Sequence, residues 1–170
     1  YSLTDAEARA LAEAGAHGVE IYNHASAIDA ARGGGTATVD YLLNEGFRIH
    51  ITATDDSHDI PRDAFGGWVM VAARDLTSDA ILAALKAGDF YASTGPDILS
   101  ITRDGTVIEI ETSPVQRIIL AADKHHAEPV AGDGITRARF DLKKFDPAFV
   151  RIVAIDARGR SAWSNPYWLG

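Results

Sequence analysis

Two side chains that can bind a metal ion stand two positions apart near the middle of the chain. Asp56 and His58 follow an apolar run at residues 48–54, which is typical of a β-strand. In an extended segment, residues i and i+2 point to the same face, so both side chains would reach one cation. A carboxylate and a neutral imidazole suit Zn, Mn or Fe better than Ca or Mg. The pair predicts part of a metal site.

The residues next to this pair add further polar groups. Asp55 has two interpretations that the sequence leaves open: it orients His58 as a hydrogen-bond acceptor, or it is a solvated or loop-capping carboxylate. Glu20 and Asn23 lie at the end of an earlier predicted strand. In α/β sheets and barrels, the carboxyl ends of the strands carry the chemistry. We therefore expect Glu20 and Asn23 at the same rim as Asp56 and His58.

The elements that position these side chains follow from residues 1–98. Helical patterns begin at the capping box Thr4-Asp5-Ala6-Glu7, near residue 37, and at residue 77, and each ends at a glycine. Strand patterns lie between them, at residues 17–22, 48–54 and 68–72. This alternation predicts an α/β fold with a mostly parallel sheet flanked by helices.

The pattern changes near Pro96. Residues 99–170 show short strand signals, and Asp104-Gly105 between two of them is typical of a β-hairpin. Alternating apolar and polar residues at 106–112 predict half-buried antiparallel strands. The sequence therefore predicts two domains, an α/β domain at residues 1–98 and a small all-β, sandwich-like domain at residues 99–170.

Composition excludes several classes of protein. The chain of 170 residues has no cysteine, so a disulfide framework and a thiolate site are excluded. No apolar run reaches the roughly 18 residues needed to span a bilayer, and we expect a cytoplasmic protein that binds no membrane. Residues 1–98 hold 6 Lys and Arg against 15 Asp and Glu. Nucleic acid is therefore an unlikely partner of this part.

Several motifs resemble one known family. The similar stretches are Gly18-Val19-Glu20-Ile21-Tyr22-Asn23, Thr54-Asp55-Asp56-Ser57-His58, and the run from Ala84 to Pro96. They look like the PHP (polymerase and histidinol phosphatase) superfamily. The tail from Val150 to Pro166 resembles the β-domain of its CehA/McbA-like metallohydrolase branch. Together the similar stretches extend over nearly the whole chain, from residue 18 to residue 166.

The resemblance implies both a fold and an activity. It implies a distorted β/α barrel that holds two or three divalent ions (Mn, Zn or Fe) and hydrolyses phosphate esters. Asp56 and His58 match the family's last metal motif, Asp-x-His. Glu20 and Asn23 match a Glu-x-x-Asn pattern, for which we favour a supporting hydrogen-bond role. A small phosphorylated or ester substrate is implied, with a metal-bound water as the nucleophile, so no catalytic side chain is assigned.

One departure from the family pattern limits this prediction. The family's His-x-His pair and its other early ligands are absent from the sequence. The chain therefore resembles the C-terminal half of a PHP barrel plus its β-domain. We expect this chain to be inactive without the N-terminal half, and a homo-oligomer is possible because the first strand would expose an unpaired edge. The alternative is a non-catalytic binding or accessory module on a degenerate half-barrel.

Overall fold

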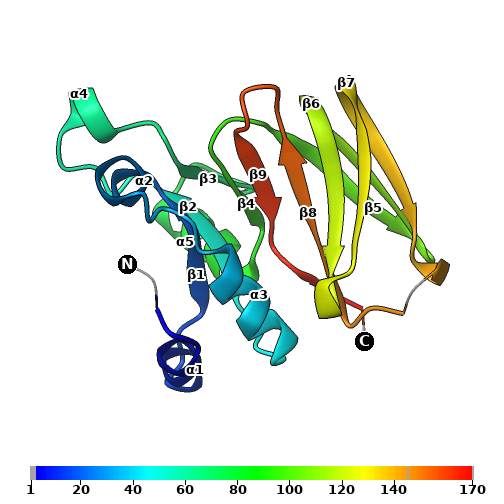
Figure 1. Ribbon diagram of the computed structural model, residues 1–170, viewed down its shortest axis with the longest axis horizontal. Helices are drawn as coiled ribbons and strands as arrows, with labels where there is room; N and C mark the ends of the chain where they lie inside the picture. The colour runs from blue at the N-terminus through cyan, green and yellow to red at the C-terminus, as the bar shows by residue number, and fades with distance from the viewer. Residues whose placement is uncertain (1–2, 145, 170) are drawn as a thin grey trace. The chain divides into compact units, whose positions relative to one another are not determined.

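The computed structural model describes residues 3–144 and 146–169, which form two compact units, Tyr1–Ala92 and Ser93–Gly170. The boundary predicted from the sequence lay after residue 98. The elements of the first unit are labelled in Figure 1. In chain order they are α1 (Asp5–Glu13), β1 (Gly18–Asn23), α2 (His24–Ala30), α3 (Thr36–Asn44), β2 (His50–Thr54), α4 (Ile60–Asp63), β3 (Trp68–Val71), α5 (Ser78–Ala87) and β4 (Phe90–Ser93).

Local sequence signals explain where the helices begin. The predicted capping box at α1 is confirmed, because the Thr4 hydroxyl accepts the Glu7 N–H and the Glu7 carboxylate accepts the Thr4 N–H. Thr77 caps α5 in the same way by accepting the N–H of Ala80. Gly88 ends α5 with a φ of 81°, a left-handed conformation that suits glycine.

The centre of the first unit is a two-stranded parallel sheet. β1 pairs with β2 from Gly18 opposite His50 to Asn23 opposite Thr54. Its core is aliphatic, and the side chains that are almost fully buried include Ile21, Val39, Leu42, Leu43 and Ile51. Burial of such side chains stabilises the unit by about 1.5–3 kcal/mol each.

The outer edge of β1 is partly covered by the loop at residues 33–35. The N–H of Asn23 donates to the carbonyl of Gly33, and the N–H of Gly35 donates to the carbonyl of Ile21. A Cβ on Gly35 would lie only 2.2 Å from the carbonyl oxygen of Glu20. The glycine is therefore required by the close approach of two backbones.

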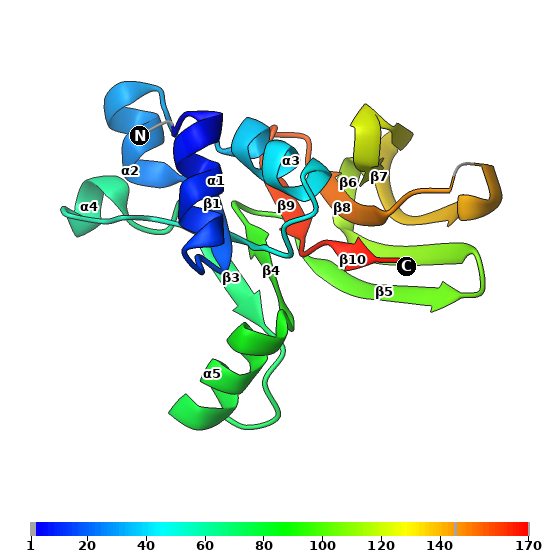
Figure 2. The same ribbon diagram turned by 90° about the horizontal axis from the view of Figure 1, so that it is seen from below.

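The second unit is built from strands. They are β5 (Ile98–Asp104), β6 (Val107–Ala122), β7 (Ala127–Asp141), β8 (Phe149–Ile155), β9 (Ser161–Ser164) and β10 (Tyr167–Trp168), with short 3₁₀ turns at Asp123–His125 and Leu142–Lys144. Figure 2 shows β5 joined to β6 by a tight turn. This turn is the predicted hairpin, because Asp104 lies opposite Val107 and Gly105 has a φ of 59°. That prediction is confirmed.

A single long strand organises the second unit. β6 pairs with β7 along nearly its whole length, while its other edge pairs first with β5 and then with β8. The register of β6 shifts between Glu111 and Arg117, around Pro114. Proline is tolerated in a sheet at such bulges, and bulges bend a strand. One curled sheet results, with Ile118, Leu120 and Ile152 fully buried on it.

The predicted fold class is wrong. The chain has 43% strand, mostly antiparallel, and 27% helix, which does not fit a distorted β/α barrel. In the first unit β1 and β2 form a sheet of their own, and β3 and β4 belong to a different sheet. In the second unit all strands join one curled sheet, instead of the separate sheets of a sandwich. Alternation of helix and strand along a chain does not decide which strands pair.

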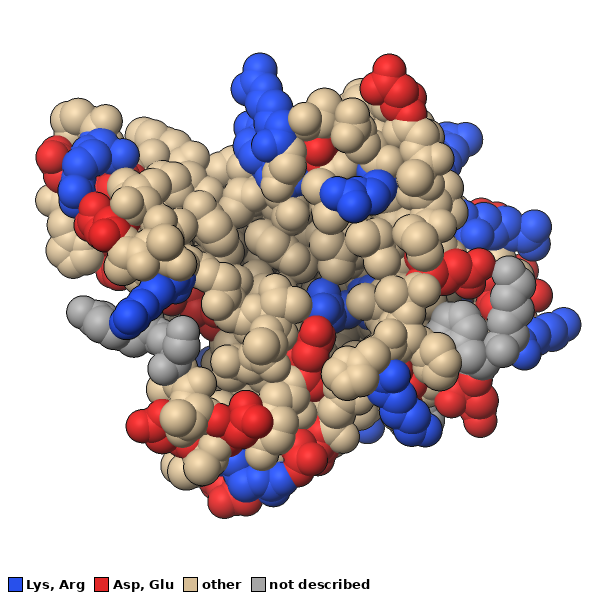
Figure 3. All heavy atoms as spheres, viewed as in Figure 1, with Lys and Arg blue, Asp and Glu red and all other residues tan. Residues whose placement is uncertain are grey.

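Two surface properties bear on the partners of the chain. None of the helices formed by residues 3–144 and 146–169 is long and apolar enough to cross a membrane. On the face drawn in Figure 3, Lys and Arg side chains are interspersed with Asp and Glu. Opposite charges also pair across strands of the second unit, where the charged atoms of Glu109 and Arg139 lie 3.4 Å apart. Such exposed pairs contribute little to stability.

Candidate functional site

Polar side chains meet at the carboxyl ends of β1 and β2. The parallel register sets Glu20 opposite Thr52 and Asn23 opposite Thr54, and Asp56 follows two residues after β2 ends. The strands shift by one residue between Glu20 and Tyr22. We call Glu20, Asn23, Thr54 and Asp56 the carboxyl-end cluster.

Asn23 connects the members of this cluster. Its Nδ2 donates to Oε2 of Glu20 at 3.0 Å and to Oδ2 of Asp56 at 3.2 Å. Its Oδ1 accepts the N–H of Ser26 at 2.8 Å and so caps α2. The Thr54 hydroxyl donates to the other oxygen of Glu20. The amide of Asn23 is therefore fixed at both ends, and it holds the Asp56 carboxylate in one place.

Asp56 and His58 line one hollow, which we call the His58 hollow. It measures about 360 Å³ and is shared with residues of α2 and the residues that follow it. The lining residues are Ala25, Ser26, Asp29, Ala30, Arg32, Asp56 and His58. Both predicted ligands are exposed. Asp56 is not extended, because its φ of 51° is left-handed, yet the loop still brings its side chain to the same hollow as His58.

The backbone of Asp56 is unusual. A positive φ costs energy for any residue with a Cβ, although Asp tolerates it better than most. Such conformations persist where the surroundings hold them, and they gather at functional sites. That support comes from Asp55, which bonds to residues 65–67, and from Asp63, which bonds to residues 57–59. Asp56 is therefore held in place from both sides of the loop.

Asp55 binds the loop that leads to β3. Its carboxylate accepts the N–H groups of Phe65, Gly66 and Gly67 at 2.7, 2.7 and 2.8 Å. Burial opposes its ionisation, but these three N–H groups outweigh burial and lower the pKa of Asp55. None of its hydrogen bonds goes to His58 among the described residues. Of the two interpretations left open by the sequence, the structure supports the loop-binding one.

Asp63 does the same for residues 57–59, and sequence reasoning missed it. Its buried carboxylate accepts the hydroxyl of Ser57 at 2.7 Å, the N–H of His58 at 3.0 Å and the N–H of Asp59 at 2.9 Å. The Ser57 hydroxyl and the His58 N–H hold the pKa of Asp63 far below its usual range. The only sequence signal is Asp59-Ile60-Pro61, which is typical of a helix start and says nothing of this contact.

Tyr22 and His24 form a second polar pair, which contacts the loop at Gly66. The Tyr22 hydroxyl is 3.1 Å from Nδ1 of His24, and the ring of His24 covers Gly66 so closely that a Cβ there would lie 2.1 Å from it. Burial, and then the charge of Asp55, raise the pKa of Tyr22. His24 is half-buried and not the exposed loop residue that its position suggests. It packs the loop and does not reach the His58 hollow.

Two further polar motifs, at residues 93–96 and 125–126, belong to the second unit. In the turn Ser93-Thr94-Gly95-Pro96, the Ser93 hydroxyl donates to the Pro96 carbonyl at 2.7 Å, and the Thr94 hydroxyl bonds to the backbone of Ser161. The Ser93 hydroxyl is thus used inside the turn and the Thr94 hydroxyl between the turn and β9, so neither is free to bind phosphate. The exposed pair His125-His126 lies between β6 and β7.

The donor set fits only part of a metal centre. Within the described ranges, no group of three or more His, Cys, Asp or Glu side chains could hold a metal ion. Asp56 and His58 supply two donors at one hollow. Asn23 donates a hydrogen bond to Asp56 and another to Glu20. Two donors leave most of the coordination to water or to other molecules.

Comparison of the chain with protein-family models, with curated proteins and with solved structures found no match.

Proposed function

We propose that the His58 hollow binds a divalent cation and that the protein is a metal-dependent hydrolase, most simply a phosphoesterase. The observation that carries this proposal is the placement of Asp56. Its left-handed backbone and its bond from Asn23 present a carboxylate to the same hollow as the imidazole of His58. The resemblance of residues 54–58 to the PHP metal motif supports it, although the fold is not the barrel of that family.

The chain's own residues have distinct tasks in this proposal. Asp56 and His58 hold the cation, and the candidate metals remain Mn, Zn and Fe. Asn23 fixes Asp56, and Glu20 fixes Asn23. A divalent cation supplies a bound water with a pKa lowered toward ~7 and positive charge beside the phosphoryl oxygens. In the overall reaction, the oxygen of water bonds to phosphorus, the ester P–O bond breaks, and the alcohol leaves with a proton.

Activity of this chain by itself is expected to be low. Two protein donors give weak metal binding, because protein ligands must replace several waters to hold a cation tightly. Further ligands, supplied from outside residues 3–144 and 146–169, therefore stay part of the proposal. So do the cytoplasmic location and the homo-oligomer.

A calorimetric titration with MnCl2 tests this proposal, together with hydrolysis of 4-nitrophenyl phosphate. Asp56→Ala and His58→Gln should each remove the binding heat and any metal-dependent turnover. The matched controls are Asp59→Ala and His17→Gln, which alter exposed side chains outside the His58 hollow. Equal Mn binding in all five proteins, the unchanged chain included, would contradict the proposed site.

The small donor set favours a second candidate, a non-catalytic binding module. Within residues 3–144 and 146–169 no third His, Cys, Asp or Glu joins the two donors. The same experiment separates the two candidates. Mn binding that depends on Asp56, with no turnover at any metal concentration, would favour the module.

A further inference from the structure

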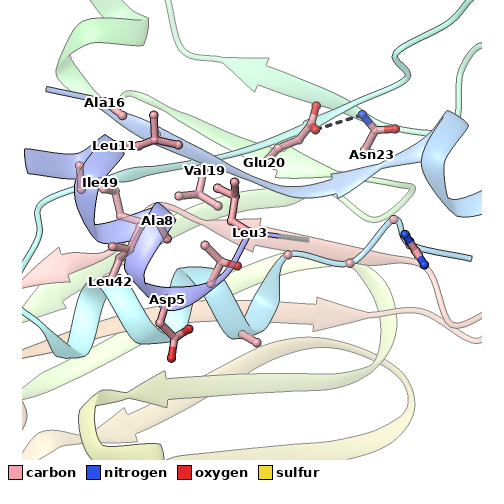
Figure 4. Close-up of a pocket in the computed structure, with 18 residues that line it drawn as sticks. Leu3, Asp5, Ala8, Leu11, Ala16, Val19, Glu20, Asn23, Leu42 and Ile49 are labelled. Carbon is pink, nitrogen blue, oxygen red and sulfur yellow. Dashed lines mark hydrogen bonds between the residues drawn. The ribbon is translucent and has the colours of Figure 1, made fainter. Parts of the chain in front are cut away.

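A second and larger hollow adjoins the candidate site. It measures about 440 Å³ and lies against α1, β1 and α3; we call it the Leu11 hollow. Figure 4 shows its wall of apolar side chains and, at the end of β1, the hydrogen-bonded pair Glu20 and Asn23. The apolar wall consists of Leu3, Ala8, Leu11, Val19, Leu42 and Ile49. Hollows of this size bind small molecules.

Arg32 lines both hollows. It borders the Leu11 hollow beside Asn23, and it borders the His58 hollow beside Asp56 and His58. Its backbone is fixed, because its N–H donates to the carbonyl of Ser26 at 3.1 Å. The two hollows are therefore neighbours that share Arg32 as a lining residue.

The charge of Arg32 is available for a ligand. Among residues 3–144 and 146–169, the ion pairs of the first unit involve Arg9 and Arg62. Three of the carboxylates that line the two hollows have other partners: Asp29 pairs with Arg62 at 2.9 Å, Glu20 accepts from Asn23 and Thr54, and Asp56 accepts from Asn23. An exposed guanidinium with no such partner is suited to a phosphate group, which it can bind through two parallel N–H bonds.

We propose that the two hollows form one binding site for a phosphate monoester of an apolar alcohol about the size of an aromatic ring system. The phosphate lies on Arg32, facing Asp56 and His58, and the alcohol part lies in the Leu11 hollow. This inference takes its reactive group from the proposed function and adds the substrate class. Arg32 is then a residue that selects the substrate by its charge.

The chemistry of the walls favours this occupant over a second copy of the chain. A protein surface would have to cover the apolar wall and also supply an anion at Arg32. A monoester has both features in one small molecule. Leu3 and Leu11 are 43% and 50% exposed, so the apolar wall is open to a ligand.

The experiment measures binding of 1-naphthyl phosphate to the full chain by NMR titration in the presence of EDTA. The ester should bind more tightly than either inorganic phosphate or 1-naphthol. Arg32→Gln should weaken ester binding about 10-fold or more, because a charge-assisted contact is lost, and should leave 1-naphthol unaffected. Leu11→Glu should weaken both aromatic probes. Arg74→Gln, which alters an exposed arginine outside both hollows, is the matched control.

Three outcomes decide the inference. Equal ester affinity in the Arg32→Gln variant would overturn it, and so would loss of ester binding at high protein concentration, which would show a second copy in the Leu11 hollow. Ester binding that depends on Arg32 without Mn uptake would support this site while removing the metal-dependent function. Because EDTA is present, failure of this inference is separate from failure of the metal site.

Discussion

Two loops of this protein are held by aspartates that accept backbone N–H groups, and only the loop after β2 also places a further carboxylate and an imidazole at one hollow. In the turn between β8 and β9, Asp156 accepts the N–H groups of Arg158 and Arg160 at 2.8 and 2.9 Å and the Nε of Arg160 at 2.7 Å. In the loop after β2, Asp55 and Asp63 accept backbone N–H groups in the same manner. All three bonds that Asp156 accepts therefore stay within this turn.

The loop after β2 differs because it also carries the exposed side chains of Asp56 and His58. Asp56 and His58 are exposed at a common hollow, while the half-buried Asp55 and the buried Asp63 hold the backbone. Asp55, Asp63 and Asp156 thus fix the backbone of a loop, whereas Asp56 is exposed on its loop. Aspartates that accept several backbone N–H groups therefore support the candidate site, and the two proposed metal ligands are the exposed side chains of the same loop.

Two glycines, Gly35 beside β1 and Gly95 beside the β8–β9 turn, should respond most differently to an added methyl group. A Cβ on Gly35 meets the backbone oxygen of Glu20 at 2.2 Å, and the backbone cannot move without disturbing the carboxyl-end cluster. We expect Gly35→Ala to cost about 3 kcal/mol. A Cβ on Gly95 meets the flexible side chain of Arg160 at 2.5 Å, so Gly95→Ala should cost about 1 kcal/mol or less.

Urea unfolding of the two variants measures this difference. Both proteins carry the same substitution, so the intrinsic effect of replacing glycine by alanine is matched. Equal losses of stability would show that the approach of residues 33–35 to β1 is not a fixed feature of the first unit.

Removal of the Asp55 carboxylate should have the next largest effect. Asp55→Ala leaves the N–H groups of Phe65, Gly66 and Gly67 without their acceptor, which we expect to cost about 2 kcal/mol. Hydrogen exchange at these three amides should become faster. Asp59→Ala is the control, because no side-chain cap bond of Asp59 is present at the start of α4. Unchanged protection of the three amides would contradict the loop-binding role.

Acid should destabilise both loops. The folded-state pKa values of Asp55, Asp63 and Asp156 lie below their usual values, so their contribution is complete above the unfolded pKa of about 4. It is lost as the pH falls through the folded pKa values. Melting temperatures measured from pH 6 down to pH 2 should therefore decline below about pH 4. The decline should be less steep in Asp55→Asn, and an identical slope would contradict the assigned shift.

The smallest change in stability is expected at Asp56. Asp56→Gly relieves a left-handed backbone, worth about 1–2 kcal/mol, but adds the entropy cost of glycine, about 0.5–1 kcal/mol, and loses the bond from Asn23. Stability should therefore stay within about 1 kcal/mol, measured by urea unfolding. A much larger loss would show that Asp56 belongs with the aspartates that fix the loop.

Local signals in the sequence predicted local structure well. The capping box at Thr4, the stop at Gly88 and the hairpin at Asp104-Gly105 each depend on a few neighbouring residues, and all three are present. The barrel was wrong because strand pairing depends on distant residues. Pro114 within β6 and Gly132 and Gly134 within β7 do not end their strands, because the two strands pair along their length.

The candidate site shows the same division. Asp56 and His58 were found as neighbours in the sequence, and they line one hollow. The bond from Asn23 to Asp56 joins residues 33 positions apart and depends on the parallel register of β1 and β2. The roles of Asp63 and Arg32 depend on how α2 and α4 are placed, which no local pattern in the sequence reports.

Paramagnetic broadening by Mn²⁺ tests the central claim most directly. In an NMR titration of the unchanged chain, the imidazole signals of His58 should broaden first, well before those of the exposed His17. In Asp56→Gly, which should remain folded, this selective broadening should disappear, while Asp59→Ala should keep it. Broadening that is equal at His58 and His17, or that persists without the Asp56 carboxylate, would contradict a cation site at the carboxyl ends of β1 and β2.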